Sequence, residues 1–492
     1  MDKQLILALD IGSSSVRGAL FDDRGRLLLK TFVRDERRMA PTRDGGAEIP
    51  AEKAFRQVVN VIDGVLERSQ SVREEITKIV SCTFWHSLIG VDETGDPTTH
   101  VLGWADNRSR EFVGILRKRF DEAAIHNHTG CRLHPGYWPA KLLWLRKRST
   151  DAWAKTARWI SFSDLLTLRL CGSAVTSISM ASGTGLFDLR RLTWAPELAK
   201  FLNVKPGSLP EIGTEVSSAL PLLPKWRRRW PRLKDAQFLL SVSDGAANNI
   251  GSGAVGKGTA ALMLGTSGAL RMVYDGDPPD PIPSGLFCYR LDRERVVLGG
   301  ALSDGGGLYD YLKRLLRVDL SDAAIAQEIA RRGPNAHGLT VLPFFAGERS
   351  TGYSEFATGS IHGLTMAHDA IDILQASMES VGYRLAEISD QLNSVTPIKR
   401  IIASGGALKA SPVWTQIIAD VLGHDIYISA ELEASLRGAV LLELEKTGKM
   451  EFTDEQSANK TRTISFHPTS HAIYRKARKR HNSVYISSGR YN

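Results

Sequence analysis

The amino-acid sequence predicts an α/β protein of two domains, each organised around a strand, a glycine-rich turn and a returning strand. The first hairpin spans residues 5–21 and turns at Gly12, and the second spans residues 260–273 and turns at Gly265. The two turns lie about half of the 492-residue chain apart. A chain of this length is too long for one hydrophobic core. The repeated hairpin therefore indicates a duplicated, two-domain architecture.

A single carboxylate stands at the end of a buried strand in each half of the chain. Asp10 precedes the first turn, and Asp244 follows the apolar run at 238–242, ahead of the second hairpin. Turns of glycine and hydroxyl residues expose several backbone N–H groups in one concavity, which suits a polyphosphate. The small residues after Asp244 would let the backbone approach a ligand closely. The pattern predicts a nucleotide held between the two halves.

The composition is that of a soluble globular enzyme, with 42% hydrophobic and 24% charged residues. No apolar run approaches the ~20 residues of a membrane span. The N-terminal sequence has no signal-peptide cleavage site, and Asp10 interrupts its apolar run. The four cysteines lack metal-binding spacing. We therefore expect a cytoplasmic protein without a membrane partner.

The net charge of +9 permits nucleic acid, a membrane surface or anionic metabolites as partners. The densest basic runs lie at 225–230 and 475–480. Solvated surface is the favoured interpretation of both runs, and a specific polyanion site is the alternative. Because no nucleic-acid-binding motif accompanies either run, we expect no nucleic-acid partner.

Hydrophobic periodicity places the remaining elements. In the first half we expect a strand at 27–32, an amphipathic helix at 51–69, a buried strand at 76–82, a helix at 140–146 and a proline-rich loop at 206–224. In the second half we expect strands that start at 297, 341, 401 and 425, and helices at 370–392, 434–446 and 467–485. Glycine turns follow the strands at 297 and 401, although Ser303 or Asp304 could simply cap the next helix.

The polar cluster at 104–109 has the composition of a sugar site, because it combines Trp104, Asp106, an amide and Arg108. Arginine binds a carboxylate with two hydrogen bonds, and aspartate and asparagine bind hydroxyls. In the alternative interpretation Asp106 is an ordinary helix cap and Arg108 a surface charge. His86 is also ambiguous, and a buried core histidine is favoured over a substrate contact.

Four motifs, in this order along the chain, resemble those of the FGGY carbohydrate kinases. They are residues 9–17, the stretch around Asp244, residues 359–364 continuing to 372–379, and residues 404–407. The resemblance covers nearly the whole chain and implies the fold shared by actin, sugar kinases and heat-shock chaperone ATPases. This is a two-domain, ribonuclease H-like α/β fold with the active site in the interdomain cleft.

Within the family, several stretches are most similar to gluconate kinases. They are residues 86–89, 104–109, 264–269 and 342–345, and the motif Gly347-Glu348-Arg349. Trp85 departs from the pattern, because the family usually has Met there. The implied domains are 1–247 for sugar binding and the catalytic Asp, 248–450 for ATP binding, and 451–492 as a basic tail helix. The resemblance is compatible with a homodimer.

The resemblance implies transfer of the ATP γ-phosphoryl group to a hydroxyl of a sugar or sugar acid. D-gluconate, giving 6-phosphogluconate, is the favoured substrate, and a ketopentose or polyol such as xylulose, ribulose, glycerol or erythritol is the alternative. An ATPase that drives conformational change and a sugar-binding regulator without turnover are the rival classes.

The resemblance also assigns roles to individual residues. Asp244 is the implied general base, with an Asx-turn role as its alternative, and Asp10 is the implied Mg²⁺ ligand, through water. Arg17 either reaches the phosphate chain or forms a strand salt bridge. Arg108 and Arg349 either bind a carboxylate or hold loops together through Asp106 and Glu348. The implied ATP-binding residues are Gly12, Ser13, Ser14, Ser15, Arg17, Gly265, Thr266, Ser267, Gly305, Gly306, Gly405, Gly406 and Ala407. The implied substrate-binding residues are Trp85, His86, Trp104, Asp106, Arg108, Asp244, Glu348 and Arg349.

Overall fold

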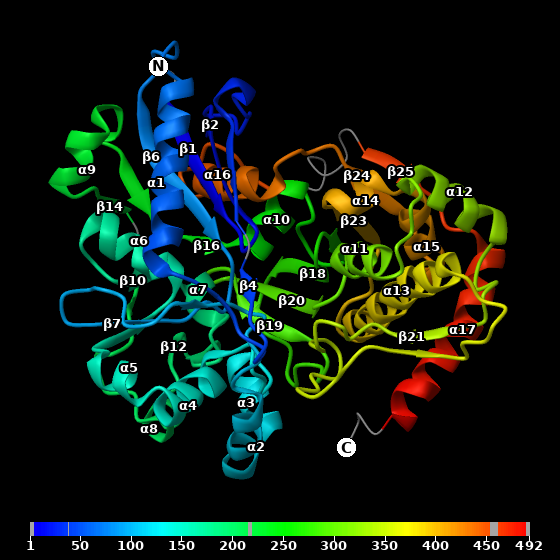
Figure 1. Cartoon of the computed structure of the whole chain (residues 1–492). Helices are drawn as coiled ribbons and strands as arrows, with labels where there is room; N and C mark the ends of the chain where they lie inside the picture. The colour runs from blue at the N-terminus through cyan, green and yellow to red at the C-terminus, as the bar shows by residue number, and fades with distance from the viewer. Residues whose placement is uncertain (1–3, 38, 215–218, 453–460, 489–492) are drawn as a thin grey trace.

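The computed structural model describes residues 4–37, 39–214, 219–452 and 461–488, and these residues form two halves with one large mixed sheet each (Figure 1). The sheet of the first half has the order β14-β15-β6-β1-β2-β3, and β16 also pairs with β6. Its strands are β14 (Ala219–Pro221), β15 (Gln237–Leu239), β6 (Ile76–Thr83), β1 (Leu5–Ile11), β2 (Ser15–Phe21), β3 (Val33–Glu36) and β16 (Val242–Ser243).

The sheet of the second half has the order β19-β20-β18-β17-β23-β24-β25. Its strands are β19 (Phe287–Arg290), β20 (Arg295–Leu302), β18 (Gly268–Asp275), β17 (Thr259–Leu264), β23 (Arg400–Ser404), β24 (Ile426–Ser429) and β25 (Thr461–Ile464). In both halves a central hairpin, β1–β2 or β17–β18, is extended by a parallel strand, β6 or β23. The sheets therefore confirm the predicted two-domain α/β fold with a repeated hairpin.

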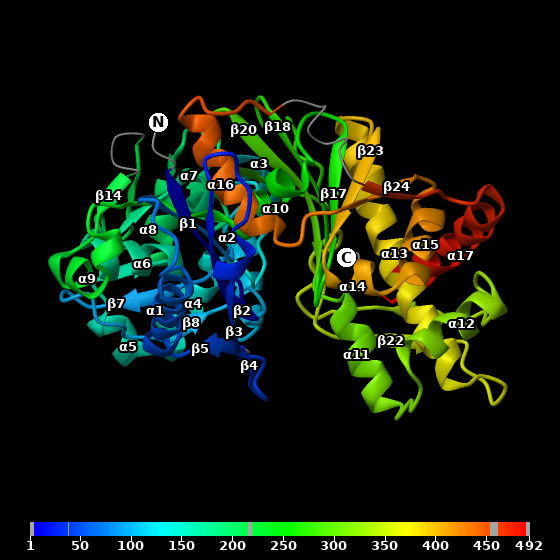
Figure 2. The same ribbon diagram turned by 90° about the horizontal axis from the view of Figure 1, so that it is seen from above.

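Two helices, α10 (Asp244–Ser252) and α16 (Ala434–Lys446), lie between the sheets (Figure 2). Their backbones touch, because a Cβ atom at Gly251 would collide with the carbonyl of Ala434. A Cβ atom at Gly438 would likewise collide with the carbonyl of Ala247. The small residues after Asp244 thus form a helix, which the sequence pattern did not predict. At Gly251 they allow close contact with α16.

Helices cover the outer faces of both sheets. On the first sheet, α1 (Ala51–Arg68) buries Val58, Ile62 and Val65. On the second, α13 (Ala370–Val395) and α15 (Pro412–Leu422) pack against each other. The basic helix expected at 467–485 is α17 (Pro468–Ser487), which packs against α13, α15 and β21 (Thr340–Leu342). Its buried residues are Tyr474, Ala477, His481 and Tyr485, and Arg478 pairs with Glu387 and Asp390 of α13.

The other elements complete the two halves. The helices are α2 (Arg110–Arg119), α3 (Glu122–Thr129), α4 (Trp138–Arg148), α5 (Thr150–Lys155), α6 (Phe162–Cys171), α7 (Ile178–Ser182), α8 (Pro196–Leu202), α9 (Pro224–Arg229), α11 (Gly306–Leu315), α12 (Asp322–Arg332) and α14 (Gly406–Ala410). The short strands are β4 (Ala40–Pro41), β5 (Ala47–Ile49), β7 (Ile89–Val91), β8 (Val101–Leu102), β9 (Arg158–Ile160), β10 (Val175–Thr176), β11 (Phe187–Asp188), β12 (Thr193–Trp194), β13 (Glu211–Ile212) and β22 (Ser360–His362). Among the described residues, no helix is long and apolar enough to span a membrane.

The strand predicted at 27–32 is wrong. Leu27 makes only an isolated bridge to Phe21, and Leu29–Thr31 is a short 3₁₀ helix. The Thr31 hydroxyl donates to the carbonyl of Leu28, and the backbone N–H of Leu20 donates to the same hydroxyl. These local side-chain hydrogen bonds close a turn that competes with strand pairing.

Candidate active site

Asp10 and Asp244 meet at the same edge of the first sheet. Both β1 and β16 run parallel to β6, where Asp10 pairs with Cys82 and Ser243 pairs with Thr83. Asp10, near the end of β1, and Asp244, directly after β16, therefore lie on either side of β6, with backbones about 10 Å apart by the usual strand spacing. Asp244 is the first residue of α10, whose N-cap is Ser243, and its Oδ1 accepts the Gly245 N–H at 2.7 Å.

Burial shifts the pKa of both carboxylates upwards. The pKa of Asp244 is raised to about 6 by burial and by the charge of Asp10, against the opposing effects of Arg271 and Arg349. The pKa of Asp10 is also raised by burial, although Arg17 and a hydrogen bond from Cys82 oppose the shift. A carboxylate with a pKa near neutrality suits proton transfer. Asp244 thus has the position and the acidity that a general base requires.

Arg17 connects the first phosphate-type turn to the second half of the chain. Its Nη1 lies 3.4 Å from Asp10 Oδ2 and 3.0 Å from Glu433 Oε2, and its Nε donates to Ser15 Oγ at 3.2 Å. This arrangement is the strand salt bridge that the sequence left open. Glu433 directly precedes α16 and was not predicted as a site residue. Contact between Arg17 and a phosphate chain stays a prediction.

Three glycine turns of the second half contact one another at the predicted nucleotide site. The Gly306 N–H donates to the carbonyl of Gly265 at 2.7 Å, and the Gly307 N–H donates to that of Thr266 at 3.1 Å. Gly405 has a φ of 101°, and a Cβ atom there would lie 2.6 Å from the Leu264 carbonyl. The structure thus brings the turns at 265–267, 305–307 and 405–407 together. Their closely spaced backbones suit an anionic nucleotide.

Two details of the phosphate-type turns were not predicted. Asp304 does not cap α11, because Gly305 is its N-cap and the Asp304 carboxylate accepts the Ala346 N–H instead. In the first half, the Gly12 N–H donates to Ser15 at 2.9 Å, and Arg37 Nε donates to the Gly12 carbonyl at 3.0 Å. Arg37 is buried, and its Nη1 has no hydrogen-bond partner among the described residues. This cation beside the turn fits a polyphosphate.

A cavity of about 90 Å³ lies beside Asp244 and is lined by residues of both halves. It contains five of the predicted substrate-binding residues, Trp85, His86, Trp104, Asp244 and Arg349. It also contains residues that were not predicted, Phe84, Tyr137, Met263, Gly268, Ala269, Arg271, Phe287, Tyr289, Ala301 and Tyr353, together with the predicted nucleotide residue Ser267. The hydroxyls of Tyr137 and Tyr289 lie 2.7 Å apart. Aromatic faces and polar tips in one cavity are typical of sites that bind a small polar ligand.

His86 lines this cavity, and its Nε2 has no hydrogen-bond partner among the described residues. Its Nδ1 contacts the carbonyl of Gly183, and burial lowers its pKa to about 3. The ring is therefore neutral at physiological pH, with the proton on Nδ1 and Nε2 as an acceptor. An acceptor at this place can receive a hydrogen bond from a sugar hydroxyl.

Asp106 and Arg108 lie outside the cavity. Arg108 Nη2 is 2.6 Å from Asp106 Oδ2 and 2.5 Å from Glu48 Oε2, and its guanidinium carbon lies 4.7 Å from the centre of the Trp144 ring. Asp106 also accepts the Ala47 N–H at 3.1 Å. Asp106 caps no helix, since Ser109 precedes α2. The arrangement corresponds to the alternative in which Arg108 holds loops together.

Glu348 and its neighbour Arg349 point to different places. Glu348 is buried against Arg384 Nη2 at 2.8 Å and against the hydroxyl of Tyr485 in α17. Arg349 lines the cavity instead, with its guanidinium carbon 4.5 Å from the centre of the Trp104 ring. It therefore does not pair with Glu348 as the alternative interpretation required.

Lys141 of α4 fixes three loops that form the cavity wall. Its buried Nζ donates to the carbonyls of His86 at 3.1 Å, Gly103 at 2.8 Å and Gly136 at 2.8 Å. His86, Trp104 and Tyr137 line the cavity from these same loops. A lysine within the apolar helix pattern was the available sequence signal, but the carbonyl partners come from distant segments. Burial lowers the pKa of Lys141 to about 7.

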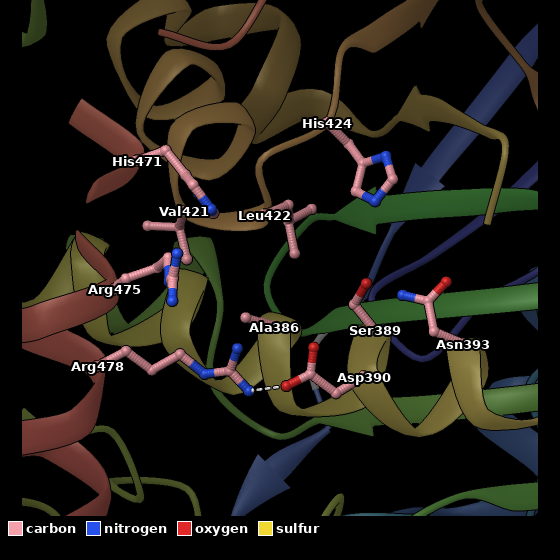
Figure 3. Close-up of a pocket in the computed structure, with 10 residues that line it drawn as sticks. All are labelled: Ala386, Ser389, Asp390, Asn393, Val421, Leu422, His424, His471, Arg475 and Arg478. Carbon is pink, nitrogen blue, oxygen red and sulfur yellow. Dashed lines mark hydrogen bonds and ion pairs between the residues drawn. The ribbon is translucent and has the colours of Figure 1, made fainter. Parts of the chain in front are cut away.

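A second cavity, of about 370 Å³, lies on the opposite side of the second half, between α13, α15 and α17 (Figure 3). His424, His471, Arg475 and Arg478 line it, and Arg478 pairs with Asp390. Arg475 and Arg478 belong to the basic run at 475–480, and the cavity contains none of the residues that the resemblance assigned to ATP or substrate binding.

Comparison with known proteins agrees with this geometry. Residues 5–219 match the N-terminal domain of the FGGY family of carbohydrate kinases, and residues 260–444 match its C-terminal domain. A gluconokinase of Bacillus subtilis (strain 168) is 27% identical over 464 residues, which cover 92% of this chain and 89% of that protein. A gluconate kinase from Lactobacillus acidophilus has a similar structure, with a TM-score of 0.87, 26% identity and coverage of 99% and 98%.

A ligand-bound xylulose kinase from Lactobacillus acidophilus is equally similar in structure, with a TM-score of 0.87, 27% identity and coverage of 98% of each chain. The similarity therefore spans kinases of at least two carbohydrates. Because the two domain matches extend over most of the sequence, the chain belongs to the FGGY family of carbohydrate kinases and is an ATP-dependent carbohydrate kinase.

Proposed function

We propose that this kinase phosphorylates a terminal hydroxyl of D-gluconate, giving 6-phosphogluconate. The observation that supports the site most directly is Asp244, a carboxylate with a pKa of about 6 on the wall of a cavity formed by both halves. The choice of gluconate draws on the gluconokinase relatives and on the two arginines, Arg271 and Arg349, that line this cavity. A ketopentose or polyol is the alternative substrate, which the similarity to a xylulose kinase favours.

Asp244 acts as the proton acceptor in this proposal. Above pH 6 the carboxylate is ionised, so it can accept the proton of the substrate hydroxyl as the oxygen–phosphorus bond forms. The bond between the γ-phosphorus and the bridging oxygen of ATP breaks at the same time, and ADP carries the electron pair away. Asp244 then returns the proton to solvent, and the carboxylate is ready for another cycle.

Asp10 is the residue that would hold Mg²⁺, through water. Its buried carboxylate has a raised pKa, which means that the surroundings disfavour its negative charge and that a cation would offset this cost. The bound cation would neutralise charge on the phosphate chain. Arg37 and Arg17 supply further positive charge beside the Gly12 turn.

The aromatic wall of the cavity serves to exclude water. Trp85 is buried and lies 4.7 Å from Tyr289 between ring centres, and Phe287 stacks on Tyr289 at 4.4 Å. Exclusion of water protects the phosphoryl group from hydrolysis and strengthens electrostatic interactions in the site. The Trp85 N–H donates to the carbonyl of Ser179 at 2.8 Å, which fixes the ring in the wall.

The test is ATP-dependent phosphorylation of a substrate panel: D-gluconate, D-xylulose, D-ribulose, glycerol and erythritol. The proposal expects the highest kcat/KM for gluconate, and a product whose phosphate is on the terminal hydroxyl by phosphorus NMR. A ketopentose or polyol that exceeds gluconate tenfold in kcat/KM would exclude gluconate as the preferred substrate. In this proposal ATP is consumed mainly by transfer to the sugar, because the cavity excludes water. A rate of ATP consumption that no sugar changes would therefore contradict the proposal.

A further inference from the structure

Two glycines, Gly299 and Gly245, leave room for the side chain of Arg271. It lies on β18 opposite Gly299 of β20, and a Cβ atom at Gly299 would be 2.7 Å from Arg271 Cγ. At the other end of the side chain, a Cβ atom at Gly245 would collide with Nη1. Larger residues at either position would therefore displace the arginine. The local sequence is compatible with this long, charged side chain at one defined place next to Asp244.

The charge of Arg271 has no partner of its own in the described part of the chain. The residue is 5% exposed, and both Nε and Nη2 lack a hydrogen-bond partner. Burial lowers its pKa to about 10, so the guanidinium stays charged at neutral pH. A buried charge without a partner is destabilising. The carboxylate that acts on it most strongly is that of Asp244, which the transfer reaction requires for itself.

The two unpartnered donors have the geometry of a carboxylate site. Nε and Nη2 form one edge of the planar guanidinium, and their N–H bonds run parallel, as a two-point contact with a carboxylate requires. Nη1, which lies against Gly245, is on the opposite side of the group. A ligand can therefore pair with this edge without displacing the contact with α10.

Arg349 adds a second positive charge to the same cavity. Its Nη2 donates to the carbonyl of Leu302 at 2.8 Å, whereas its buried Nε has no partner among the described residues. The charges of Arg271 and Arg349 act on each other, which disfavours the cavity without an anion. The hydroxyls of Tyr137 and Tyr289 and the free nitrogen of His86 can bond sugar hydroxyls nearby. The chemistry of the cavity is that of a polyhydroxylated anion.

We propose that Arg271, assisted by Arg349, binds the carboxylate of an aldonic acid and thereby selects sugar acids over neutral sugars. This inference rests on the proposed kinase function and identifies the residue that discriminates between substrates.

The experiment compares D-gluconate with D-gluconamide and D-glucitol, which keep the hydroxyl pattern and lose the charge. Calorimetric binding without nucleotide, and kcat/KM with ATP, are measured for the full-length protein and for Arg271→Lys, Arg271→Met and Arg108→Met. We expect the wild type to prefer gluconate over gluconamide by about 10- to 150-fold, the range of a charge-assisted pair. Arg271→Met should lose this preference, and binding of the neutral ligands should change less than about threefold.

Arg271→Lys separates the effect of charge from that of donor geometry, and Arg108→Met is the control for general damage to the protein. Arg271→Lys keeps the charge and loses the parallel donors, so it should retain only part of the preference. Arg108→Met removes an arginine that is paired with two carboxylates, Asp106 and Glu48, outside the cavity. Its ratio of gluconate to gluconamide binding should equal that of the wild type. An equal loss for charged and neutral ligands in Arg271→Met would overturn the proposal.

The outcomes also distinguish this inference from the proposed function. Gluconate that binds through Arg271 but is not phosphorylated would support the carboxylate site and contradict the proposed activity. Phosphorylation of a neutral sugar by a protein that does not bind gluconate would overturn the carboxylate site and leave the kinase chemistry standing. If the Arg271 variants do not fold, the wild-type comparison decides, because equal affinity for gluconate and gluconamide contradicts the inference.

Discussion

Arg108 and Arg271 are two arginines with opposite electrostatic environments. Arg108 is held by Asp106 and Glu48, and these carboxylates raise its pKa above the usual value. Arg271 has two unpartnered donors in the described structure, and burial lowers its pKa to about 10. The first arginine is satisfied within the protein, and the second is available to a ligand. A residue type in a suggestive motif therefore indicates a function only once its partners are known.

The largest effect is expected at Asp244, the carboxylate that acts most strongly on Arg271. Asp244→Asn keeps the shape and removes the proton acceptor, which costs about 10²- to 10⁴-fold in kcat, or about 3–5.5 kcal/mol. Nucleotide binding should survive, because Asp244 lies on the cavity wall and not in the three glycine turns. Steady-state kinetics and calorimetric titration of an ATP analogue measure the two effects. A variant that keeps more than about a third of wild-type kcat would remove Asp244 from this role.

The next effect tests whether Arg108 is structural. Arg108→Met leaves the buried Asp106 with only its two backbone donors, the N–H groups of Ala47 and of residue 108, and leaves Glu48 without its guanidinium partner. Breaking a buried pair by removing one member costs about 3 kcal/mol of unfolding free energy. Urea denaturation measures this loss. Unchanged stability together with a selective loss of gluconate turnover would return Arg108 to the substrate site.

Much of the fold could be predicted from the sequence, because it depends on apolar runs that the hydrophobic pattern of the sequence shows directly. The hairpins at Gly12 and Gly265 and the helix at 370–392 were predicted close to their observed bounds. Helix α10 was missed because glycine and asparagine have low helix propensity. Its stability comes instead from packing against α16, which lies far away in the sequence. Local propensity cannot report such a contact.

The residues of the site could be predicted only where they lie in a recognisable motif. Asp244, Trp85 and Arg349 lie in recognisable stretches, and the structure brings all three to one cavity. Arg271 and Tyr289 lie inside ordinary strand patterns, and only the pairing of β18, β19 and β20 places them at the site. The carbonyl partners of Lys141 come from three separate loops. Contacts between segments that are distant in the sequence could therefore not be predicted from the spacing of residues.

An effect of opposite sign is expected for Arg271 in the ligand-free protein. Arg271→Met replaces an unpartnered buried charge with an apolar side chain of similar length. Such replacements are neutral or stabilise by up to about 4 kcal/mol. The unfolding free energy in urea, measured without sugar, should thus be equal to or above that of the wild type, whereas Arg108→Met lies below it. A loss of more than about 2 kcal/mol in Arg271→Met would mean that Arg271 has a structural role.

The pH dependence of catalysis provides a further test of the same region. Because the pKa of Asp244 is raised to about 6, the fraction of ionised base falls by up to about tenfold for each pH unit below that value. We expect kcat/KM for the sugar to be nearly constant above pH 7 and to decrease about fivefold between pH 6 and pH 5. Rates at saturating ATP across this range measure it. A profile that stays flat to pH 5 would contradict the burial of the base.

The last effect is the loss of folding stability that the ionised carboxylate of Asp244 causes. Its pKa is about 6 when folded and close to the ordinary 3.8 when unfolded, so the folded state binds the proton more tightly. The carboxylate therefore costs nothing well below pH 3.8; the cost grows as the pH rises from about 4 to about 6 and levels off above that at about 3 kcal/mol. Asp244→Asn should accordingly be more stable than the wild type at pH 7 and about equally stable at pH 3. Urea denaturation at the two pH values measures the difference, and a variant that is less stable at pH 7 would show that the ionised carboxylate is stabilised by its neighbours, Arg271 included.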